Sequence, residues 1–299
     1  MNDFPKFKAI IAIDPTEPEL RPFGESLVWF REWTTRLHAT IEAVFVMFGH
    51  SSSRLFTEAA FGDFVRTLNL GQNAGTKILL EKSTSRRKAV EKLAHYLKDE
   101  QADVVVVSSR GRSGPGRLVL GSFAEGLLAI SPIPLLFLAE SGEHYKASHR
   151  ILFPTDLSEP SHRALELLLK QMSGYEGEVI IYHALSPPGA IYDTGFLGIP
   201  VYQSESEWLE QKAWTNLECE KMLQKVHNAG MKGRVLVSNG VMNTPLAIQK
   251  AALEENVDLI AMASVSRGLQ SAILGSVSKE VFRFKKWPVW VVGPEVHKQ

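Results

Sequence analysis

The two halves of this chain repeat one order of strands and turns, and this repeat limits the possible folds more than any other feature. Asp14 closes an early apolar run, and Asp156 closes a similar run 142 residues later. Asp103 and Asp258, which each precede a later apolar run, are 155 residues apart. Self-similarity over about 150 residues is the length of a whole domain, so we predict two copies of one domain in tandem. The second copy is about 13 residues longer, most simply through an insertion in residues 186–207.

Each copy alternates short apolar runs with helical patterns. Residues 103–107 read Asp-Val-Val-Val-Val, and an apolar run without alternation is typical of a strand buried on both faces of a parallel sheet. Strand alternating with helix predicts an α/β fold with two tandem, doubly wound, five-stranded parallel-sheet domains. The predicted strands cover residues 8–13, 41–48, 77–80, 103–107 and 134–138 in the first copy and 150–153, 179–183, 234–237, 257–262 and 287–292 in the second.

The boundaries follow from a polar stretch between the copies. We predict a first domain at residues 1–140, a linker at residues 141–149 and a second domain at residues 150–299.

Charge and cysteine content narrow the class of partner. Lys and Arg number 33, as do Asp and Glu, so nothing favours nucleic acid or a membrane surface as the main partner. Cys219 is the one cysteine and cannot form an internal disulfide, which fits a reducing compartment. No secretory leader pattern and no apolar run of about 18 residues is present. We therefore expect a cytoplasmic protein.

The valine run leads into the part of the chain with the strongest ligand-binding pattern. Glycines follow Ser108, and a helical pattern begins after Gly121 and Ser122. A buried strand, a glycine loop and a helix N-terminus suit a phosphate group, because free backbone N–H groups and the helix dipole point at the anion. Asp14, at the end of the first strand, is placed to bind ribose hydroxyls or a metal ion. The alternatives are a glycine loop without a ligand and an aspartate that caps a helix or a turn.

Several better-known motifs are absent. No GxxxxGK[ST] phosphate loop occurs, and no GxGxxG follows the first strand. The nine histidines form no HxH or HExxH pattern, and there is no GxSxG elbow. His183 ends a buried strand, where a hydrogen-bonded core histidine is the more common role. We assign no catalytic residue, no metal-ligand cluster and no enzymatic activity, with slow ATP hydrolysis as the alternative.

Taken together, these motifs resemble the universal stress protein family. The sequence FPTDLSE at residues 153–159 is similar to the opening strand of that family. The family's loop motif is Gly, two residues, Gly, nine residues, then Gly-Ser or Gly-Thr. In the first copy these places are held by Ser108, Gly111, Gly121 and Ser122, so only the first glycine is replaced. The resemblance covers nearly the whole chain, twice.

This resemblance implies a nucleotide-binding fold that holds ATP or AMP in some members, with Mg²⁺ as a candidate companion. By position, Asp14 would contact ribose or the metal, and the backbone of Val46 would meet adenine. Arg110 and Arg112 add positive charge to the loop, where a solvated side chain is an equal alternative. The remaining contacts to ribose and phosphate would come from Ser108, Gly111, Gly121, Ser122 and Phe123.

The second copy departs further from the motif. Residues 263–266 read Ala-Ser-Val-Ser where two loop glycines are expected, and residues with a Cβ cannot take positive φ freely. Asp156, Gly275 and Ser276 keep the corresponding places. We predict that this second site is weak or empty.

The leading interpretation is a cytoplasmic stress-response or regulatory protein that binds an adenine nucleotide in its first domain. Single-domain relatives pair through their last strands, so residues 135–138 and 289–292 are expected to pair within the chain as an internal pseudo-dimer. The chain would then be a monomer or a homodimer, with an unknown protein partner. The alternative is a scaffold that binds no nucleotide and works through protein contacts. The insertion at residues 186–207 would then be its docking surface. A lid over a pocket and a packed surface loop are the other interpretations of that insertion.

Overall fold

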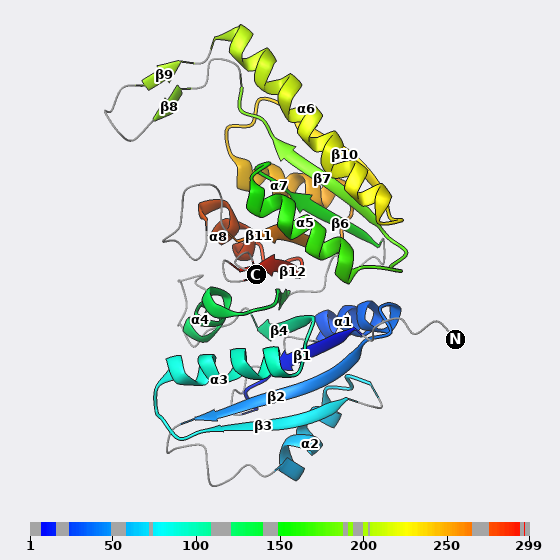
Figure 1. Ribbon diagram of the computed structural model, residues 1–299, viewed down its shortest axis with the longest axis vertical. Coiled ribbons are helices and arrows are strands. Elements are labelled where there is room, and N and C mark those ends of the chain that lie inside the picture. Colours follow the sequence, from blue (N-terminus) through cyan, green and yellow to red (C-terminus); the bar gives the residue numbers. More distant parts are fainter. Residues whose placement is uncertain are drawn as a thin grey trace. The chain divides into compact units, whose positions relative to one another are not determined.

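This computed structural model describes residues 7–15, 24–48, 58–71, 74–108, 121–139, 149–187, 191–193, 200–202, 204–264, 275–293 and 296. The chain falls into two compact units. The first unit contains residues 1–147 and 262–299, and the second contains residues 148–261. Each unit is a sheet with helices packed on it (Figure 1).

The first unit is built on six paired strands in the order β12-β5-β4-β1-β2-β3. All neighbours run parallel except β12, which runs antiparallel to β5. α3 packs on β2 and β3, and α2 packs on β3. The elements are β1 (Lys8–Ala12), α1 (Gly24–Arg36), β2 (Thr40–Phe48), α2 (Glu58–Thr67), β3 (Gly75–Glu81), α3 (Arg86–Asp99), β4 (Val104–Ser108), α4 (Ser122–Ile130), β5 (Leu135–Leu138), α8 (Ser276–Arg283) and β12 (Val289–Val292).

The valine strand confirms the predicted α/β class. Val104, Val105 and Val106 are fully buried in β4, and Val107 is only 4% exposed. Because successive side chains of a strand point to opposite faces, full burial along β4 requires that both faces of the sheet be covered.

The second unit has four strands in the order β10-β7-β6-β11, all parallel. The insertion forms a separate antiparallel hairpin of β8 and β9, followed by the 24-residue helix α6. Its elements are β6 (Arg150–Pro154), α5 (Glu159–Gln171), β7 (Glu178–Ala184), β8 (Ile191–Asp193), β9 (Pro200–Tyr202), α6 (Glu205–Asn228), β10 (Lys232–Ser238), α7 (Thr244–Glu254) and β11 (Leu259–Ala263), of which residues 259–261 lie in this unit.

The start of α6 shows why a helix follows the hairpin directly. The Ser204 hydroxyl accepts a hydrogen bond from the Glu207 N–H, and the Glu207 carboxylate accepts one from the Ser204 N–H at 2.8 Å. This reciprocal capping box satisfies two N–H groups at the start of the helix and stabilises α6 at the end of the insertion.

The repeated aspartates Asp103 and Asp258 have the same role in both copies. The Asp103 carboxylate accepts a hydrogen bond from the Lys8 N–H at 2.7 Å. The Asp258 carboxylate accepts hydrogen bonds from the N–H groups of His149 and Arg150 at 2.8 and 3.3 Å. Each aspartate therefore binds the backbone where the first strand of its copy begins. The spacing that revealed the repeat reflects a structural contact rather than a ligand site.

The predicted pairing of the two last strands is confirmed. Trp290 lies opposite Leu136 in the antiparallel pair of β12 and β5, and both side chains are fully buried. This pairing places the end of the second sequence copy in the first compact unit. The border between the two compact units therefore falls inside the second copy. The predicted domains at residues 1–140 and 150–299, with a linker at residues 141–149, describe the sequence repeat and stay predictions.

Candidate functional site

The strand order creates a switch point beside Asp14. β1 pairs with β2 on one side and with β4 on the other. After β1 the chain therefore forms strands on one side of β1 and later crosses to form β4 on the opposite side. In doubly wound sheets, ligands bind beyond the carboxyl ends of the strands at such a point. Asp14 follows β1 by two residues, and Ser108 ends β4. The structure thus brings together the ends of the two strands that the sequence marked.

The end of β2 lies on the other side of Asp14. The Ile13 N–H donates to the Val44 carbonyl at 2.9 Å, so the backbone of Val44 faces β1. Val46 is two residues further on and its backbone faces the same way, beyond the last residue of β1 that pairs with β2. Its side chain is buried. This is the orientation in which backbone groups could meet a flat heterocycle.

The N-terminus of α4 is the part of the candidate site where the sequence predicts a phosphate group. Gly121 is the N-cap residue and provides no side-chain cap, because it has no side chain. Ser122 is the first helical residue and is exposed, and Phe123 is half-buried. The first N–H groups of an uncapped helix, together with the helix dipole, favour an anion.

Arg86 is the functional candidate that the sequence interpretation missed. It is the first residue of α3, and its Nη1 donates a hydrogen bond to the hydroxyl oxygen of Ser122 on α4. A guanidinium group is therefore held at the N-terminus of α4, where a phosphate is expected. The signal in the sequence was the triplet Arg-Arg-Lys at residues 86–88, which is an unfavourable choice for a helix start.

Several predicted site residues lie outside the described residues. Gly111 and Arg112 belong to residues 109–120, as does Arg110, and the side chain of Ser108 is not described either. Their assignment to a nucleotide stays a prediction.

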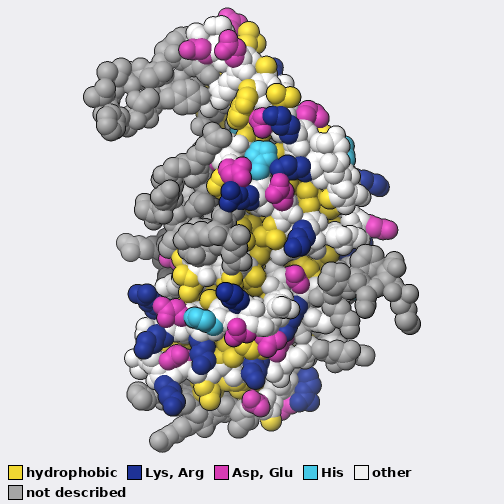
Figure 2. All heavy atoms as spheres, viewed as in Figure 1, with side chains coloured by type: hydrophobic (Ala, Val, Ile, Leu, Met, Phe, Trp, Pro, Cys, Tyr) yellow, Lys and Arg dark blue, Asp and Glu magenta, His cyan; other side chains and the backbone are white. Residues whose placement is uncertain are grey.

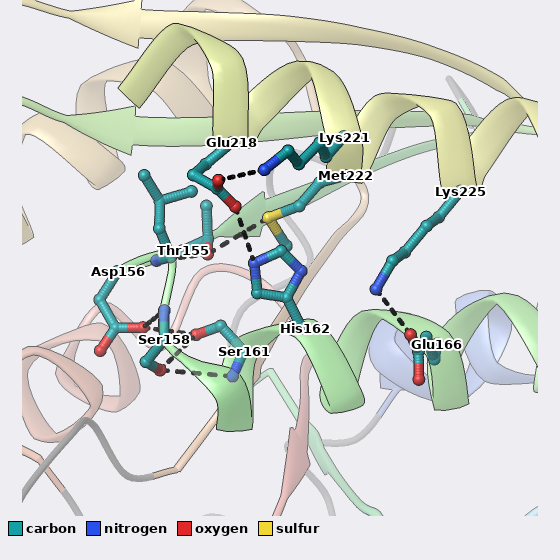
Figure 3. A network of polar contacts seen from close by, with 11 residues as sticks. Thr155, Asp156, Ser158, Ser161, His162, Glu166, Glu218, Lys221, Met222 and Lys225 are labelled. Atoms are coloured by element: carbon teal, nitrogen blue, oxygen red, sulfur yellow. Dashed lines mark hydrogen bonds and ion pairs between the residues drawn. The ribbon is translucent and has the colours of Figure 1, made fainter. Parts of the chain in front are cut away.

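In the second copy, the contacts of Asp156 include those of a turn (Figure 3). One carboxylate oxygen, Oδ1, accepts hydrogen bonds from the Ser158 N–H at 3.0 Å and from the Ser161 hydroxyl at 2.7 Å. The Ser158 hydroxyl in turn caps α5. These bonds stabilise the turn that leads into α5. A role in a turn or a helix cap is the alternative that the sequence analysis gave for such an aspartate.

The N-terminus of α8 differs from that of α4. The Gly275 N–H donates to the Ser264 carbonyl at 2.9 Å, and the Ser278 hydroxyl lies 3.4 Å from the same oxygen. At the residue that corresponds to Arg86, the first of α7, the second copy has the neutral Thr244. Gly275 and Ser276 thus start a helix as Gly121 and Ser122 do, but without a cation from the preceding helix start.

The histidines of the second unit have structural surroundings. His183 Nδ1 donates to the Thr155 carbonyl at 2.9 Å. Burial lowers the pKa of His183 below its usual value, although this hydrogen bond and the nearby Asp156 carboxylate oppose the shift. His162 on α5 lies 3.8 Å from a Glu218 carboxylate oxygen on α6 (Figure 3), and burial lowers its pKa as well. His183 thus joins β7 to the residues that follow β6, and His162 lies between α5 and α6.

Cys219 is unsuited to nucleophilic chemistry. It is fully buried on α6, and burial raises the pKa of its thiol to about 12. A thiol of this kind stays protonated near neutral pH.

Within the described parts of the chain, no three His, Cys, Asp or Glu side chains are grouped closely enough to hold a metal ion. Nor does any described helix have the length and apolar character that crossing a membrane requires. On the face shown in Figure 2, Lys and Arg side chains of the described residues are interspersed with Asp and Glu, in keeping with the balanced charge.

Comparison with known proteins gives consistent matches over both copies. The model of the universal stress protein family matches residues 57–138 and 147–293. The fold is similar to a universal stress protein from Archaeoglobus fulgidus DSM 4304, with a TM-score of 0.63 and 20% identity over 97% of this chain and 99% of that chain. It is also similar to a putative universal stress protein from Pseudomonas aeruginosa UCBPP-PA14, with a TM-score of 0.64 and 15% identity over 97% of this chain and 94% of that chain. No curated protein matches the sequence.

Proposed function

Because this chain belongs to the universal stress protein family and carries two of its domains in tandem, we propose that it binds an adenine nucleotide, ATP or AMP, in its first copy. In this role it is a cytoplasmic regulatory protein of the stress response. The bound nucleotide would act as a signal or a stabilising ligand.

One observation carries this proposal: the switch point between β1 and β4 lies beside the residues that the family motif marks. Asp14 follows β1, and the motif residues Gly121 and Ser122 start the helix that follows β4. Val46 would meet adenine through its backbone and Asp14 would bind ribose or a Mg²⁺ ion. The start of α4 would bind phosphate.

At the start of α4, the backbone N–H groups and the Arg86 side chain suit a phosphate group, whereas the acidic Glu125 in the first turn of α4 does not. Gly121 leaves the helix N-terminus without a side-chain cap, and Arg86 adds a guanidinium group there. Positive charge and N–H donors in one place are what a phosphate needs.

The corresponding place in the second copy fits a phosphate less well. Gly275 donates its N–H to Ser264, and the Asp156 carboxylate accepts two hydrogen bonds from its own turn. We therefore propose that nucleotide binds to the first copy and that the second site is degenerate.

The test begins with the purified full-length protein. It is denatured, and the released small molecules are separated and identified, after which ATP and AMP are titrated by calorimetry with and without Mg²⁺. Two matched variants assign the site: Gly121→Val adds a side chain at the start of α4, and Gly275→Val adds the same side chain at the start of α8.

We expect one site per chain, which Gly121→Val weakens at least about tenfold and Gly275→Val leaves unchanged. No released nucleotide and no heat with millimolar ATP would contradict the proposal. Equal losses in both variants would contradict the assignment to the first copy.

A second candidate is a scaffold that works through protein contacts. It is favoured by α6, on which the apolar side chains of Leu209, Trp214 and Leu217 are each about half exposed. A scaffold of this kind would give no heat with any nucleotide, so the same titration separates the two functions. Slow ATP hydrolysis is the weakest candidate, and ATP turnover well above the buffer rate would favour it.

A further inference from the structure

Helix α6 carries apolar side chains on two opposite faces and buries only one of them. The buried face packs against β7, β10 and α5, and its residues are Thr215, Cys219, Met222 and Val226. On the opposite face the side chains of Leu209, Trp214 and Leu217 are 54%, 46% and 56% exposed. A single exposed leucine is ordinary on a protein surface, whereas several apolar side chains on one helix face indicate a contact with another molecule.

The exposed face contains one row of residues spaced four apart. Such residues are neighbours on a helix surface and form a continuous ridge. Acidic side chains gather at the top of Figure 2, where α6 begins in Figure 1. The row therefore has an acidic end, an apolar middle around a small residue and a basic end. Its members are all exposed, and in chain order they are Glu205, Leu209, Ala213, Leu217 and Lys221.

This row is complementary to itself when a second copy of it runs in the opposite direction. Antiparallel pairing about Ala213 places Leu209 next to Leu217 of the second copy, because these two residues are equally far from Ala213 along the chain. The same pairing places Glu205 next to Lys221 of the second copy. Two-fold symmetry repeats each contact, so both ends of the row meet an opposite charge. A parallel pairing would place like charges together.

The middle of the row suits the close approach of two helices. Ala213 has a small side chain, and ridges of residues four apart interdigitate when two helices cross at about −50°. Trp214 lies beside Ala213, and large aromatic side chains near the centre of an interface contribute most to binding. Lys221 donates to the Glu218 carboxylate on its own helix at 2.7 Å, and its ammonium group has two further N–H donors for another carboxylate.

We propose that the outer face of α6 is a homodimer interface, at which α6 pairs antiparallel with α6 of a second copy of this chain about Ala213. This contact is separate from the pairing of β5 with β12 within the chain. It requires no nucleotide, so it goes beyond the proposed function and does not depend on it. One helix face is a small area, and we expect a reversible dimer with a dissociation constant on the order of 1–100 µM.

The experiment measures the mass of the full-length protein by sedimentation velocity at about 1–300 µM, a range that spans the expected dissociation constant. The test variant is Leu217→Glu, which places a charge in the apolar middle of the row. The matched control is Leu246→Glu on α7, since Leu246 is 58% exposed and Leu217 is 56% exposed. Melting curves check that both variants fold.

We expect the unmodified protein and Leu246→Glu to form dimers with the same dissociation constant, and Leu217→Glu to stay monomeric over the whole range. A protein that is monomeric at every concentration would overturn the inference and leave the outer face of α6 to a different partner. A dimer that survives Leu217→Glu, or that Leu246→Glu weakens equally, would also overturn it, because the interface would then lie elsewhere.

Charge exchange tests the antiparallel register. In a dimer of identical copies, Glu205→Lys or Lys221→Glu alone places like charges together and should weaken association roughly 3- to 20-fold. A mixture of these two single variants restores opposite charges at both ends of the row. The double variant does the same with the net charge of the unmodified protein, so a general attraction between oppositely charged chains does not explain its recovery.

We expect the mixture and the double variant to associate more tightly than either single variant. If neither recovers, the antiparallel pairing about Ala213 is wrong. Calorimetry with ATP and AMP measures the proposed nucleotide binding independently, so failure of this dimer leaves the proposed function standing.

Discussion

At the scale of single residues, Asp103 and Asp258 show that an aspartate has the same structural role in each copy of the repeat. Asp258 is nearly buried and accepts hydrogen bonds from two backbone N–H groups, those of His149 and Arg150. A buried N–H group that loses its acceptor retains the full penalty for leaving water. The aspartate is therefore a stability residue at a position that marks the sequence repeat.

We predict that Asp258→Ala lowers the free energy of unfolding by about 1–3 kcal/mol, because it leaves two N–H groups without their acceptor. The measurement is the shift in the midpoint of urea unfolding. Asp103→Ala serves as the matched variant in the first copy, and it should act in the same direction because it removes the acceptor of the Lys8 N–H. An unchanged midpoint in Asp258→Ala would contradict the stabilising role given to its carboxylate.

The residue scale is also where the sequence was least informative about the site. Asp14 and Gly121 stand in positions that spacing could reveal, because the family motif is written in the order of the chain. Arg86 is different: its contact with Ser122 spans 36 residues and depends on how the chain crosses from β3 to β4. No spacing rule along one chain predicts which helix starts come close in space.

At the scale of elements, burial patterns made most strands predictable and left others hidden. The apolar runs at residues 41–48 and 134–138 correspond closely to β2 and β5. The hairpin of β8 and β9 was not expected, because its two strands have three residues each and pair only with each other. Strands that bury no continuous face leave no periodic pattern in the sequence.

The C-terminal strand β12 is held at its end by a close approach of two backbones. A Cβ atom on Gly293, directly after β12, would collide with the carbonyl oxygen of Leu128 on α4. We predict that Gly293→Ala lowers the free energy of unfolding by about 1–3 kcal/mol, since a backbone atom cannot move aside easily.

Gly62 in α2 provides the control for that substitution. A Cβ atom there would meet nothing within 4 Å, so Gly62→Ala should be neutral or stabilise the helix by up to about 1 kcal/mol. Thermal melting of both variants measures the difference. If both glycine variants shift the melting temperature equally, the close approach of Gly293 to α4 is not a determinant of stability.

At the scale of the whole molecule, the first compact unit is completed by residues from both ends of the chain. Leu135 and Leu136 of β5 are fully buried, and β12 covers that edge of β5. A fragment of residues 1–147 lacks β12 and would present a flat apolar strand edge, which pairs readily with another chain.

We predict that this fragment forms homodimers or larger aggregates, whereas the full-length chain does not associate through β5. Size-exclusion chromatography with light scattering measures the masses of both. Adding Leu136→Lys to the fragment places a charge on the exposed strand and should reduce the association. A fragment that stays monomeric at micromolar concentration would contradict the role given to β12.

The pairing of β5 with β12 also has a consequence in time. β5 leaves the ribosome about 150 residues before β12, which corresponds to about 8–30 s of synthesis at about 5–20 residues per second. The second unit is one continuous segment, residues 148–261, so it is fully synthesised before the first unit can close. The order in which the units are completed is thus the reverse of the order in which they begin. During this interval β12 is not yet there to pair with β5, so the edge of β5 is open to pairing with another chain.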